Sequence, residues 1–523
     1  MTHAPSPSST LWRRWAPGVW LACFAASLLL FRIPLLGDDQ ALFGIGAQIL
    51  RDGGVLYRDF WDVKQPGIYW FNQAALALPG AGGRHWLLVV WLATTGLASA
   101  VLAAIAAPYT GAWLFAPLLT LGTCLLVSDP SNIGQLETLV PLPITGVIVC
   151  VLGVAARRIP LRGGWLAAGV LTGVTALFKL ILASIPATIL LIALARLGFQ
   201  RGARATALAF AMALLGAALV AAATIAPFAA AGALEPMLWT QFAWPVQALG
   251  AIGHAPVSRL LDAAAWFAGA VALMLPAAWV GLRGTLARRM RRRDAPPPSP
   301  QGDPGSPASL GLADRDLPIR SLAGACLAAW LLVDLAAIAA QQLSWHAYHF
   351  TLLIWPIGML AALGAGQAIQ RRGSRVALWV LVLALAVNLL RFGYRQWAPP
   401  EPPIEPRHYV AKLPALAAQL ARSPCRTAIV FGSPALLLAT GLSPAGALTG
   451  QLAPILLPVQ WRQLEDTIRD TRPGYLYLHA GAPMLIGAKR QALERLIERD
   501  YRVLATDAMR GVWMVPVTGA CAG

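Results

Sequence analysis

The chain has 523 residues, of which 57% are hydrophobic and only 12% are charged, and its mean hydropathy is +0.61. This composition excludes an ordinary soluble globular protein and is typical of a polytopic membrane protein. The net charge of +18 does not indicate nucleic-acid binding, because the basic residues form short clusters between apolar runs, as in the cytoplasmic loops of membrane proteins.

The first apolar run covers about residues 16–36 and follows Arg13 and Arg14. It is long enough to cross a hydrocarbon core of about 30 Å, whereas a cleaved signal peptide would have a shorter apolar core. We therefore expect a cytoplasmic N-terminus and an external first loop. The same criterion predicts further spans near 86–107, 110–127, 139–156, 205–229, 260–282, 321–341, 350–369 and 375–393.

Residues 165–196 form an apolar segment that is too long for one span. A straight helix of this length would measure about 48 Å and would leave Lys179 in the middle of the membrane. Both flanks are basic, so both should be cytoplasmic. We therefore expect two short helices with Lys179 near an external turn. Eleven spans result, and an odd number places the C-terminal region outside.

The predicted fold class is mainly α, with a transmembrane domain at 1–393 and a small external α/β domain at 394–523. The first external loop is residues 37–85, and a Pro-, Ser- and Gly-rich stretch at about 288–320 predicts a disordered cytoplasmic linker. In the C-terminal domain "RTAIVFG" and "GYLYLHA" predict strands, whereas "QWRQLEDTIRDTR" and "AKRQALERLIERD" predict amphipathic helices.

Two cysteines, Cys425 and Cys521, bracket the C-terminal domain. An external compartment permits a disulfide between them. Spacing in the sequence does not establish proximity, so the sequence leaves open whether they pair.

The first external loop begins with an expected amphipathic helix on the membrane surface, which ends at Gly53 and Gly54. The apolar residues on its face are Leu42, Ile45, Ile49 and Leu50. Asp38 and Asp39 precede or begin this helix, where free backbone N–H groups favour an ionised carboxylate. One aspartate suffices as an N-cap, so the second indicates a base or a cation site.

Further polar residues are expected on the same side of the membrane. Asp59, Asp62 and Lys64 follow in the first loop, where the lysine either pairs with these aspartates or binds an anionic head group. A lysine is a compact point charge that suits phosphate. Glu137 stands just before a span and His349 stands between two spans, so polar groups from distant parts of the chain converge.

The first loop resembles that of the GT-C class of polytopic glycosyltransferases, in the branch of the protein O-mannosyltransferases and the lipid A aminoarabinose transferase. The resemblance covers residues 16–393. Its most specific elements are Asp38-Asp39, Gly53-Gly54, Tyr57-Arg58-Asp59 and Lys64-Gln65-Pro66-Gly67.

Three later positions resemble the family less specifically. Glu137 is similar to its second acidic position and Lys179 to its later lysine. His349-Phe350 with Pro356 resembles a His-Tyr pair ahead of a proline, with Phe350 in place of the usual tyrosine.

The resemblance implies a glycosyltransferase of the bacterial inner membrane that moves a hexose or pentose from a polyprenyl-phosphate donor to an external acceptor. Lys64, Lys179 and His349 would bind the donor phosphate, which leaves as a stabilised anion. Of the catalytic candidates Asp38 and Asp39, Asp38 would remove the proton from the acceptor hydroxyl, and direct displacement would invert the anomeric centre.

The remaining acidic residues would orient the acceptor or a divalent cation. These residues are Glu137, Asp59 and Asp62, with Asp39 in support. The sequence identifies neither the sugar nor a metal requirement, and the acceptor is a lipid, a polysaccharide or a protein. Membrane lipids are the other expected partners.

Two alternatives belong to other functional classes. A transporter or flippase for a lipid-linked sugar would also need external basic residues and many spans, but it would carry midplane charges and internal repeats. A membrane scaffold with a solvated acidic loop would not need paired aspartates. Charges at one surface and the lack of a sequence repeat favour the enzyme.

Overall fold

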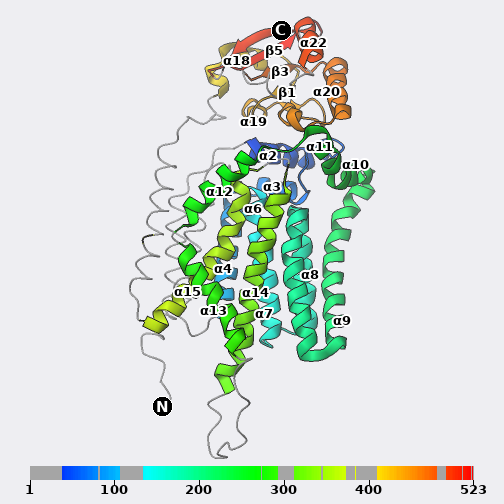
Figure 1. Ribbon diagram of the computed structural model, residues 1–523. Coiled ribbons are helices and arrows are strands. Elements are labelled where there is room, and N and C mark those ends of the chain that lie inside the picture. Colours follow the sequence, from blue (N-terminus) through cyan, green and yellow to red (C-terminus); the bar gives the residue numbers. More distant parts are fainter. Residues whose placement is uncertain are drawn as a thin grey trace, which may run out of the picture. The chain divides into compact units, whose positions relative to one another are not determined.

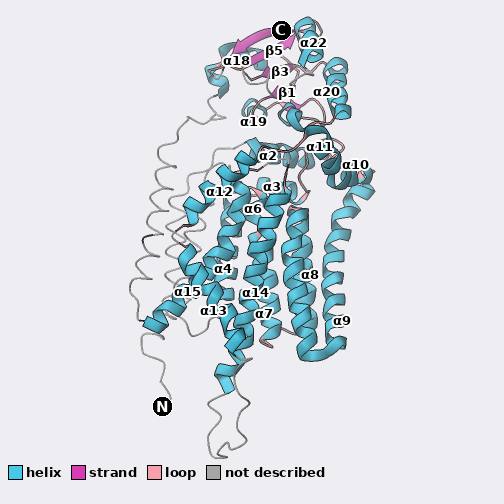
Figure 2. Ribbon diagram, in the orientation of Figure 1, coloured by secondary structure: helices cyan, strands magenta, loops and turns pink. Residues whose placement is uncertain are grey.

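The computed structural model describes residues 38–79, 83–106, 134–272, 274–291, 311–342, 345–372, 383, 409–479, 490–508, 510–519 and 521. Over these ranges the chain is mainly helical and carries one small sheet (Figures 1 and 2). It divides into two compact units. We call Met1–Arg32, His85–Ala223 and Ala255–Pro399 the helical unit, and Ile33–Arg84, Thr224–His254 and Pro400–Gly523 the loop–sheet unit.

The helical unit consists of membrane-length helices and short connecting turns. Its elements are α4 (Gly83–Ala106), α6 (Leu136–Leu139), α7 (Pro141–Ala155), α8 (Leu161–Phe178), η1 (Leu180–Ala183), most of α9 (Ser184–Ala230), α12 (Val257–Val271), α13 (Leu275–Arg291), α14 (Gly311–Ala340), η3 (Ala347–Leu353) and α15 (Ile354–Arg372).

Six helical segments among the described residues are long and apolar enough to cross a membrane, which makes the chain an integral membrane protein. They are Leu136–Ala155, Leu161–Phe178, Leu180–Arg201, Ala203–Ala230, Ile319–Ala340 and Ala347–Gly364. The predicted spans at 16–36 and 110–127, and all of 375–393 except residue 383, lie outside the described residues.

The predicted helix break at Lys179 is present. Helix α8 ends at Phe178, the Lys179 backbone is extended with φ −155° and ψ 105°, and η1 leads from there into α9. A second break falls at Gly202, whose φ of 81° is readily adopted only by glycine, so α9 consists of two helices. Residues 161–230 therefore form three helices, as the basic flanks predicted.

Two expectations for the helical unit need correction. The single span predicted at 260–282 is two helices, α12 and α13, because Pro276 lacks an amide N–H and its ring clashes with the carbonyl four residues earlier. The predicted linker at 288–320 is too long at both ends. Helix α13 continues through strong helix formers to Arg291, and α14 begins at Gly311. Residues 292–310 lie outside the described residues.

The loop–sheet unit combines short helices with a mixed five-stranded sheet. Its helical elements are α2 (Asp38–Arg51), α3 (Gly67–Leu76), α10 (Leu234–Leu238), the π-helical turn η2 (Trp239–Ala243), α11 (Trp244–Ile252), η4 (Val410–Lys412), α18 (Pro414–Arg422), α19 (Ala435–Thr440), η5 (Gly450–Ile455), α20 (Pro458–Thr471) and α22 (Arg490–Asp500). Its strands are β1 (Thr427–Phe431), β2 (Ser443–Pro444), β3 (Tyr475–Leu478), β4 (Tyr501–Thr506) and β5 (Val512–Pro516).

The sheet has the strand order β2-β1-β3-β5-β4. Strand β1 runs parallel to β2 and β3, whereas β5 is antiparallel to β3 and β4. The predicted strands are β1 and β3, and the predicted helices are α20 and α22. The small C-terminal α/β fold expected from the sequence is therefore confirmed.

The C-terminal region shares its unit with two loops from the membrane part of the chain. The Trp61 backbone N–H donates to the Ala447 carbonyl at 2.8 Å, and the Trp244 indole donates to Gln460 Oε1 at 3.2 Å. Helix α2 packs against both α3 and α19. The α/β fold and the loops thus have a common core, while the predicted domain boundary at 393/394 lies outside the described residues.

Cys425 and Cys521 are joined by a disulfide, with a Cα–Cα distance of 5.7 Å. The bond closes a loop across 96 positions of the sequence. It therefore answers the question that the sequence left open.

We predict that Cys425→Ser lowers the free energy of unfolding of the loop–sheet unit by about 4 kcal/mol, because a long loop gains much conformational entropy when its cross-link is removed. Thermal unfolding of the purified protein in detergent measures the effect. Cys150→Ser, at a free cysteine of the helical unit, is the control. Equal unfolding temperatures for the two variants would contradict a stabilising role for the disulfide.

Candidate functional site

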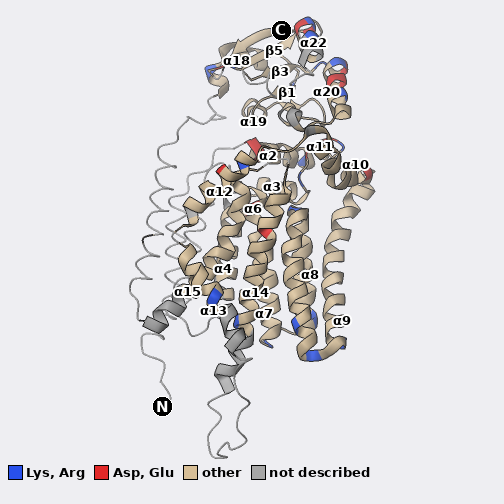
Figure 3. Ribbon diagram, in the orientation of Figure 1, with Lys and Arg blue, Asp and Glu red and all other residues tan. Residues whose placement is uncertain are grey.

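The first acidic pair of the chain lies in the first turn of α2 (Figure 3). Asp38 is exposed and Asp39 is partly exposed, where the positive end of the helix dipole favours ionised carboxylates. The middle of α2 packs tightly, since a Cβ at Gly46 would lie 2.5 Å from the Tyr69 ring and 2.9 Å from the Phe60 ring. A fixed helix therefore presents the two carboxylates at its end.

Lys64 lies beside this acidic pair. Its ammonium is 3.9 Å from Asp39 Oδ2 and 5.8 Å from the centroid of the Phe43 ring. The Tyr57 hydroxyl donates to the Lys64 carbonyl at 2.8 Å, and Gln241 donates to the same hydroxyl at 3.1 Å. The structure therefore brings Lys64 and Asp39 together at the outer limit of an ion pair, and hydrogen bonds hold the lysine backbone in place.

Asp59 is bonded within its own turn. It accepts hydrogen bonds from the Val55 backbone N–H at 2.7 Å and from the Arg58 guanidinium at 2.8 and 2.9 Å. The hydrogen bond from Arg58 holds the pKa of Asp59 below its usual range. Arg58 also donates to the Ala231 carbonyl at 3.0 Å, so this ion pair connects the first loop to the segment after α9.

Asp62 is buried in the core of the loop–sheet unit. The Tyr69 hydroxyl donates to Asp62 Oδ2 at 2.5 Å, and the Val63 backbone N–H donates to Oδ1 at 2.6 Å. Burial raises the pKa of Asp62, while the nearby charge of Lys64 opposes that shift. Both oxygens of this carboxylate therefore have protein donors.

The segment 234–252 supplies residues that the sequence analysis did not select. The Trp61 indole donates to Thr240 Oγ1 at 3.1 Å in a buried contact. The next residue, Gln241, donates to the Tyr57 hydroxyl. The available signal was the pair "TQ" inside the otherwise apolar run "PMLWTQFAWPV". Polar residues in such a run need hydrogen-bond partners, but a sequence does not say which ones.

The helical unit contains a separate ion pair. Lys179 Nζ lies 2.5 Å from Glu137 Oε1, and the two side chains are only 13% and 2% exposed. Lys179 directly follows the end of α8, and Glu137 lies in the first turn of α6. These positions allow the two side chains to meet. His349 is buried in η3, which packs against α6 and α14.

Asp334 of α14 is a third ionisable residue in this region, and the sequence analysis missed it. It is fully buried and close enough to interact electrostatically with both Glu137 and Lys179. In the sequence, Asp334 is the single acidic residue of the apolar run "LAAWLLVDLAAIAA". An ionisable residue within a span is costly and usually functional, so this position could have been selected. We call Glu137, Lys179 and Asp334 the charge cluster.

The charge cluster has more acceptors than donors. Within the described part of the chain, Glu137 Oε2 and both Asp334 oxygens have no hydrogen-bond partner. Two carboxyl groups thus face one ammonium group in surroundings that penalise uncompensated charge. Lys179 is therefore essential to the electrostatic balance of the helices.

The predicted site residues divide between the two units. The loop–sheet unit holds Asp38, Asp39, Asp59, Asp62 and Lys64, whereas the helical unit holds Glu137, Lys179 and His349. Close pairs within a unit are Asp39 with Lys64 and Glu137 with Lys179. The described residues contain no group of three or more His, Cys, Asp or Glu side chains arranged to hold a metal ion.

These features define a polytopic membrane fold of the GT-C type, with an acidic first loop and a C-terminal α/β region. Two solved structures of ArnT from Cupriavidus metallidurans share it. The apo structure has a TM-score of 0.60 and 14% identity over 99% of each chain. The structure bound to undecaprenyl phosphate has a TM-score of 0.57 and 14% identity over 98% of this chain and 99% of that chain.

The likeness to ArnT is a likeness of fold, and it confirms the architecture that the loop motifs predicted. No protein-family model matches the sequence, and no curated protein sequence matches it either. The fold is therefore recognised through its three-dimensional arrangement and a few short motifs.

We predict that Lys179→Met lowers the free energy of unfolding by about 3–5 kcal/mol, because it leaves the Glu137 carboxylate buried without its partner. Adding Asp334→Asn should recover part of this loss, since the amide removes the second acidic group. Thermal unfolding of each variant in one detergent measures both effects.

The matched control for Asp334→Asn is Asp262→Asn, at an exposed position of α12 in the same unit. It should recover nothing in the Lys179→Met background. If both amide substitutions recover stability equally, Asp334 does not belong to the charge cluster.

Proposed function

We propose that this protein is a glycosyltransferase that moves a sugar from a polyprenyl-phosphate donor to an acceptor on the external face of the membrane. The observation that carries the proposal is the placement of Lys64 beside the Asp38-Asp39 pair at the start of α2. The fold supports it, since ArnT shares the fold and has been solved with undecaprenyl phosphate bound.

Lys64 is proposed to bind the donor phosphate. Its ammonium is partly shielded from water, which strengthens its attraction for a phosphate, and its backbone is held by Tyr57. Negative charge grows on the phosphate as the sugar leaves, so the ammonium stabilises the transition state more than the ground state. Lys179 and His349 are further phosphate ligands in this proposal, on the basis of the family resemblance alone.

Asp38 is proposed as the base. Its carboxylate is exposed in the first turn of α2 and is accessible to an acceptor hydroxyl. The hydroxyl oxygen attacks the anomeric carbon while Asp38 takes the proton, and the bond to the phosphate oxygen breaks with its electron pair. This single displacement inverts the anomeric centre. Asp39, close to Lys64, positions the lysine.

The remaining acidic residues have supporting roles. Glu137, Asp59 and Asp62 were expected to orient the acceptor or a divalent cation. The bonds of Asp59 to Arg58 and of Asp62 to Tyr69 favour positioning of the first loop for these two residues. The orienting role for Glu137 stays a proposal.

The proposed topology has eleven spans, a cytoplasmic N-terminus and a periplasmic C-terminal domain in a bacterial inner membrane. The basic loops between α7 and α8 and at Gly202 support this orientation. The transferred group is a hexose or a pentose, and the acceptor is a lipid, a polysaccharide or a protein.

Transport of a lipid-linked sugar is the second candidate function. The charge cluster favours it, because buried ionisable residues within spans are typical of transporters. The two functions differ in a purified system. A transferase forms the glycosylated acceptor in detergent, where a transporter has no gradient or compartment to act on.

We predict that Asp38→Asn reduces turnover by about 10²–10⁴-fold, the usual contribution of a general base, while donor binding persists. Mass spectrometry of envelope glycans and polyprenyl-phosphate sugars should compare cells with the intact protein, with Asp38→Asn, or with neither. One sugar should disappear from an acceptor and its lipid-linked donor should accumulate in both defective strains.

The matched control is Asp52→Asn, at an aspartate just beyond the other end of α2 that bonds to Gln48. This variant should behave like the intact protein. If Asp38→Asn also behaves like the intact protein, Asp38 only caps the helix, and the transporter becomes the better explanation.

We predict that Lys64→Ala weakens binding of undecaprenyl phosphate to the purified protein by about 10- to 100-fold, because a charged hydrogen bond to phosphate is lost. Titration with the lipid phosphate, followed by thermal shift, measures the affinity. Lys412→Ala, at an exposed lysine of the same unit, is the control. An unchanged affinity in Lys64→Ala would remove this lysine from the donor site.

A further inference from the structure

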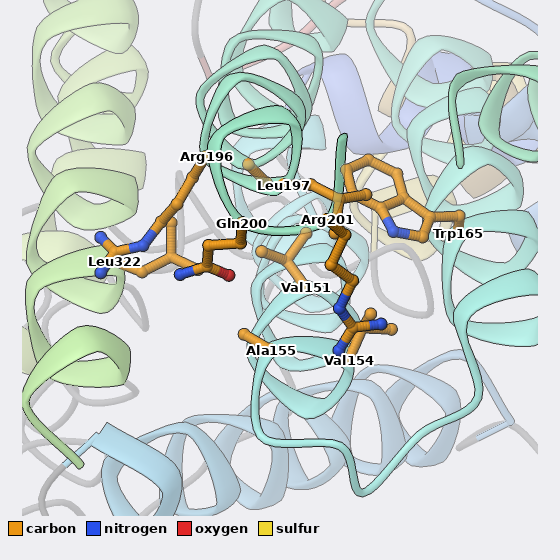
Figure 4. Close-up of a pocket in the computed structure, with 10 residues that line it drawn as sticks. Val151, Val154, Ala155, Trp165, Arg196, Leu197, Gln200, Arg201 and Leu322 are labelled. Carbon is orange, nitrogen blue, oxygen red and sulfur yellow. The ribbon is translucent and has the colours of Figure 1, made fainter. Parts of the chain in front are cut away.

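A basic pocket lies in the helical unit where α7, α8, the first helix of α9 and α14 meet (Figure 4). Its polar lining consists of Trp165, Arg196, Gln200 and Arg201, and its walls are aliphatic side chains of α7, α9 and α14. None of the lining residues carries a carboxylate. The pocket is therefore rich in hydrogen-bond donors and poor in acceptors.

The pocket is separate from the charge cluster. Trp165 stands near the start of α8 and Lys179 directly follows its end, so about 21 Å of helix separates them. Helix α7 shows the same separation, because Glu137 lies just before it and the pocket residues lie in its last turns. The two polar sites therefore occupy opposite ends of the same helices.

The Trp165 indole is an unexplained donor in this pocket. The side chain is 3% exposed, and its Nε1 has no hydrogen-bond partner among the described residues. Buried tryptophan N–H groups normally find an acceptor, since an unpaired donor is costly. A ligand that supplies oxygen acceptors would satisfy it.

Three further donors come from the last turns of the first helix of α9. Arg196, Gln200 and Arg201 extend from these turns into or beside the pocket (Figure 4). Arg196 also donates to Ser321 Oγ at 2.9 Å, which fixes its guanidinium against α14. The Arg196 guanidinium points toward Leu322, whereas Arg201 and Trp165 lie together on the other side of the pocket (Figure 4). A guanidinium and an indole N–H suit the oxygens of a phosphate.

The pocket lies at one boundary of the predicted spans. Span 136–155 ends there, span 161–178 begins there and span 180–201 ends there. The two connecting segments at residues 156–162 and 199–204 contain Arg157, Arg158, Arg162, Arg201 and Arg204 and no acidic residue (Figure 3). Such a concentration of arginine indicates the cytoplasmic leaflet, where basic pockets between helices bind anionic lipid head groups.

We propose that the pocket lined by Trp165, Arg196, Gln200 and Arg201 binds the phosphate of an anionic phospholipid from the cytoplasmic leaflet. The lipid phosphate accepts from the Trp165 indole and the Arg201 guanidinium, and the acyl chains of the lipid stay in the cytoplasmic leaflet. Because four helices contribute to the pocket, the bound lipid holds their ends together. This role is independent of the proposed sugar transfer.

The test uses the purified full-length protein in a delipidating detergent, with thermal unfolding as the readout. Added phosphatidylglycerol should raise the unfolding temperature by several degrees, whereas phosphatidylcholine with the same acyl chains should have little effect. Inorganic phosphate should also have little effect. An equal response to phosphatidylcholine would overturn the charge recognition, and an equal response to inorganic phosphate would overturn the assignment to a lipid.

Variants localise the effect. Arg201→Gln and Trp165→Phe should each reduce the apparent affinity for phosphatidylglycerol by about tenfold, because each removes one donor to the phosphate. Arg204→Gln, in the same basic loop but outside the pocket lining, is the matched control and should leave the affinity unchanged. If Arg204→Gln and Arg201→Gln weaken binding equally, the lipid is attracted by the general charge of the loop and the pocket proposal is wrong. Arg201 is exposed, so its substitution keeps the test valid even if Trp165→Phe fails to fold.

Discussion

The helical unit depends on one constraint, which is that a charge buried among apolar helices must be compensated. The ion pair between Glu137 and Lys179 meets this constraint. The lysine reaches its partner only because α8 stops at Phe178 and the Lys179 backbone is extended. A continuous helix would have placed the ammonium elsewhere on the helix surface. The cost of burying a charge thus explains the break in the helix, and the break in turn allows residues 161–230 to form three helices.

The same constraint is met differently in the first loop. Asp62 is buried and receives hydrogen bonds from Tyr69 and Val63, while Asp59 is bonded to Arg58. These contacts occupy the carboxylates that lie inside the loop. Asp38 differs from them because it is exposed in the first turn of α2. Of these three carboxylates, Asp38 is the one that solvent reaches most readily.

Much of the fold could be predicted from the sequence, because membrane spans and amphipathic elements have strong periodic signals. The break at Lys179 followed from helix length and basic flanks, and the helix ahead of Gly53 followed from its apolar spacing. Strands β1 and β3 followed from short apolar runs. The split of 260–282 at Pro276 was missed because the apolar run continues through the proline and hides the break.

The partners of the site residues were less predictable, because contacts between distant segments leave no local pattern. The sequence suggested that Lys64 pairs with Asp59 or Asp62, whereas the structure brings its ammonium to 3.9 Å from Asp39. The contacts of Thr240 and Gln241 with the first loop span more than 170 positions, and nothing in either segment specifies them. Asp334 did leave a signal in the sequence, because a lone acidic residue stands inside an apolar span.

Asp334 also bears on the choice between the two candidate functions. A transporter must pass substrate through the helices, so its buried charges need to change partners during each cycle. In the charge cluster, Lys179 pairs with Glu137 at 2.5 Å, and Asp334 has no hydrogen bond to any described residue. Asp334 has no role in the proposed transfer, so its removal should change folding and leave sugar transfer intact. Stability and turnover should vary independently at this position, which is the behaviour expected of an enzyme whose chemistry takes place at the α2 aspartates.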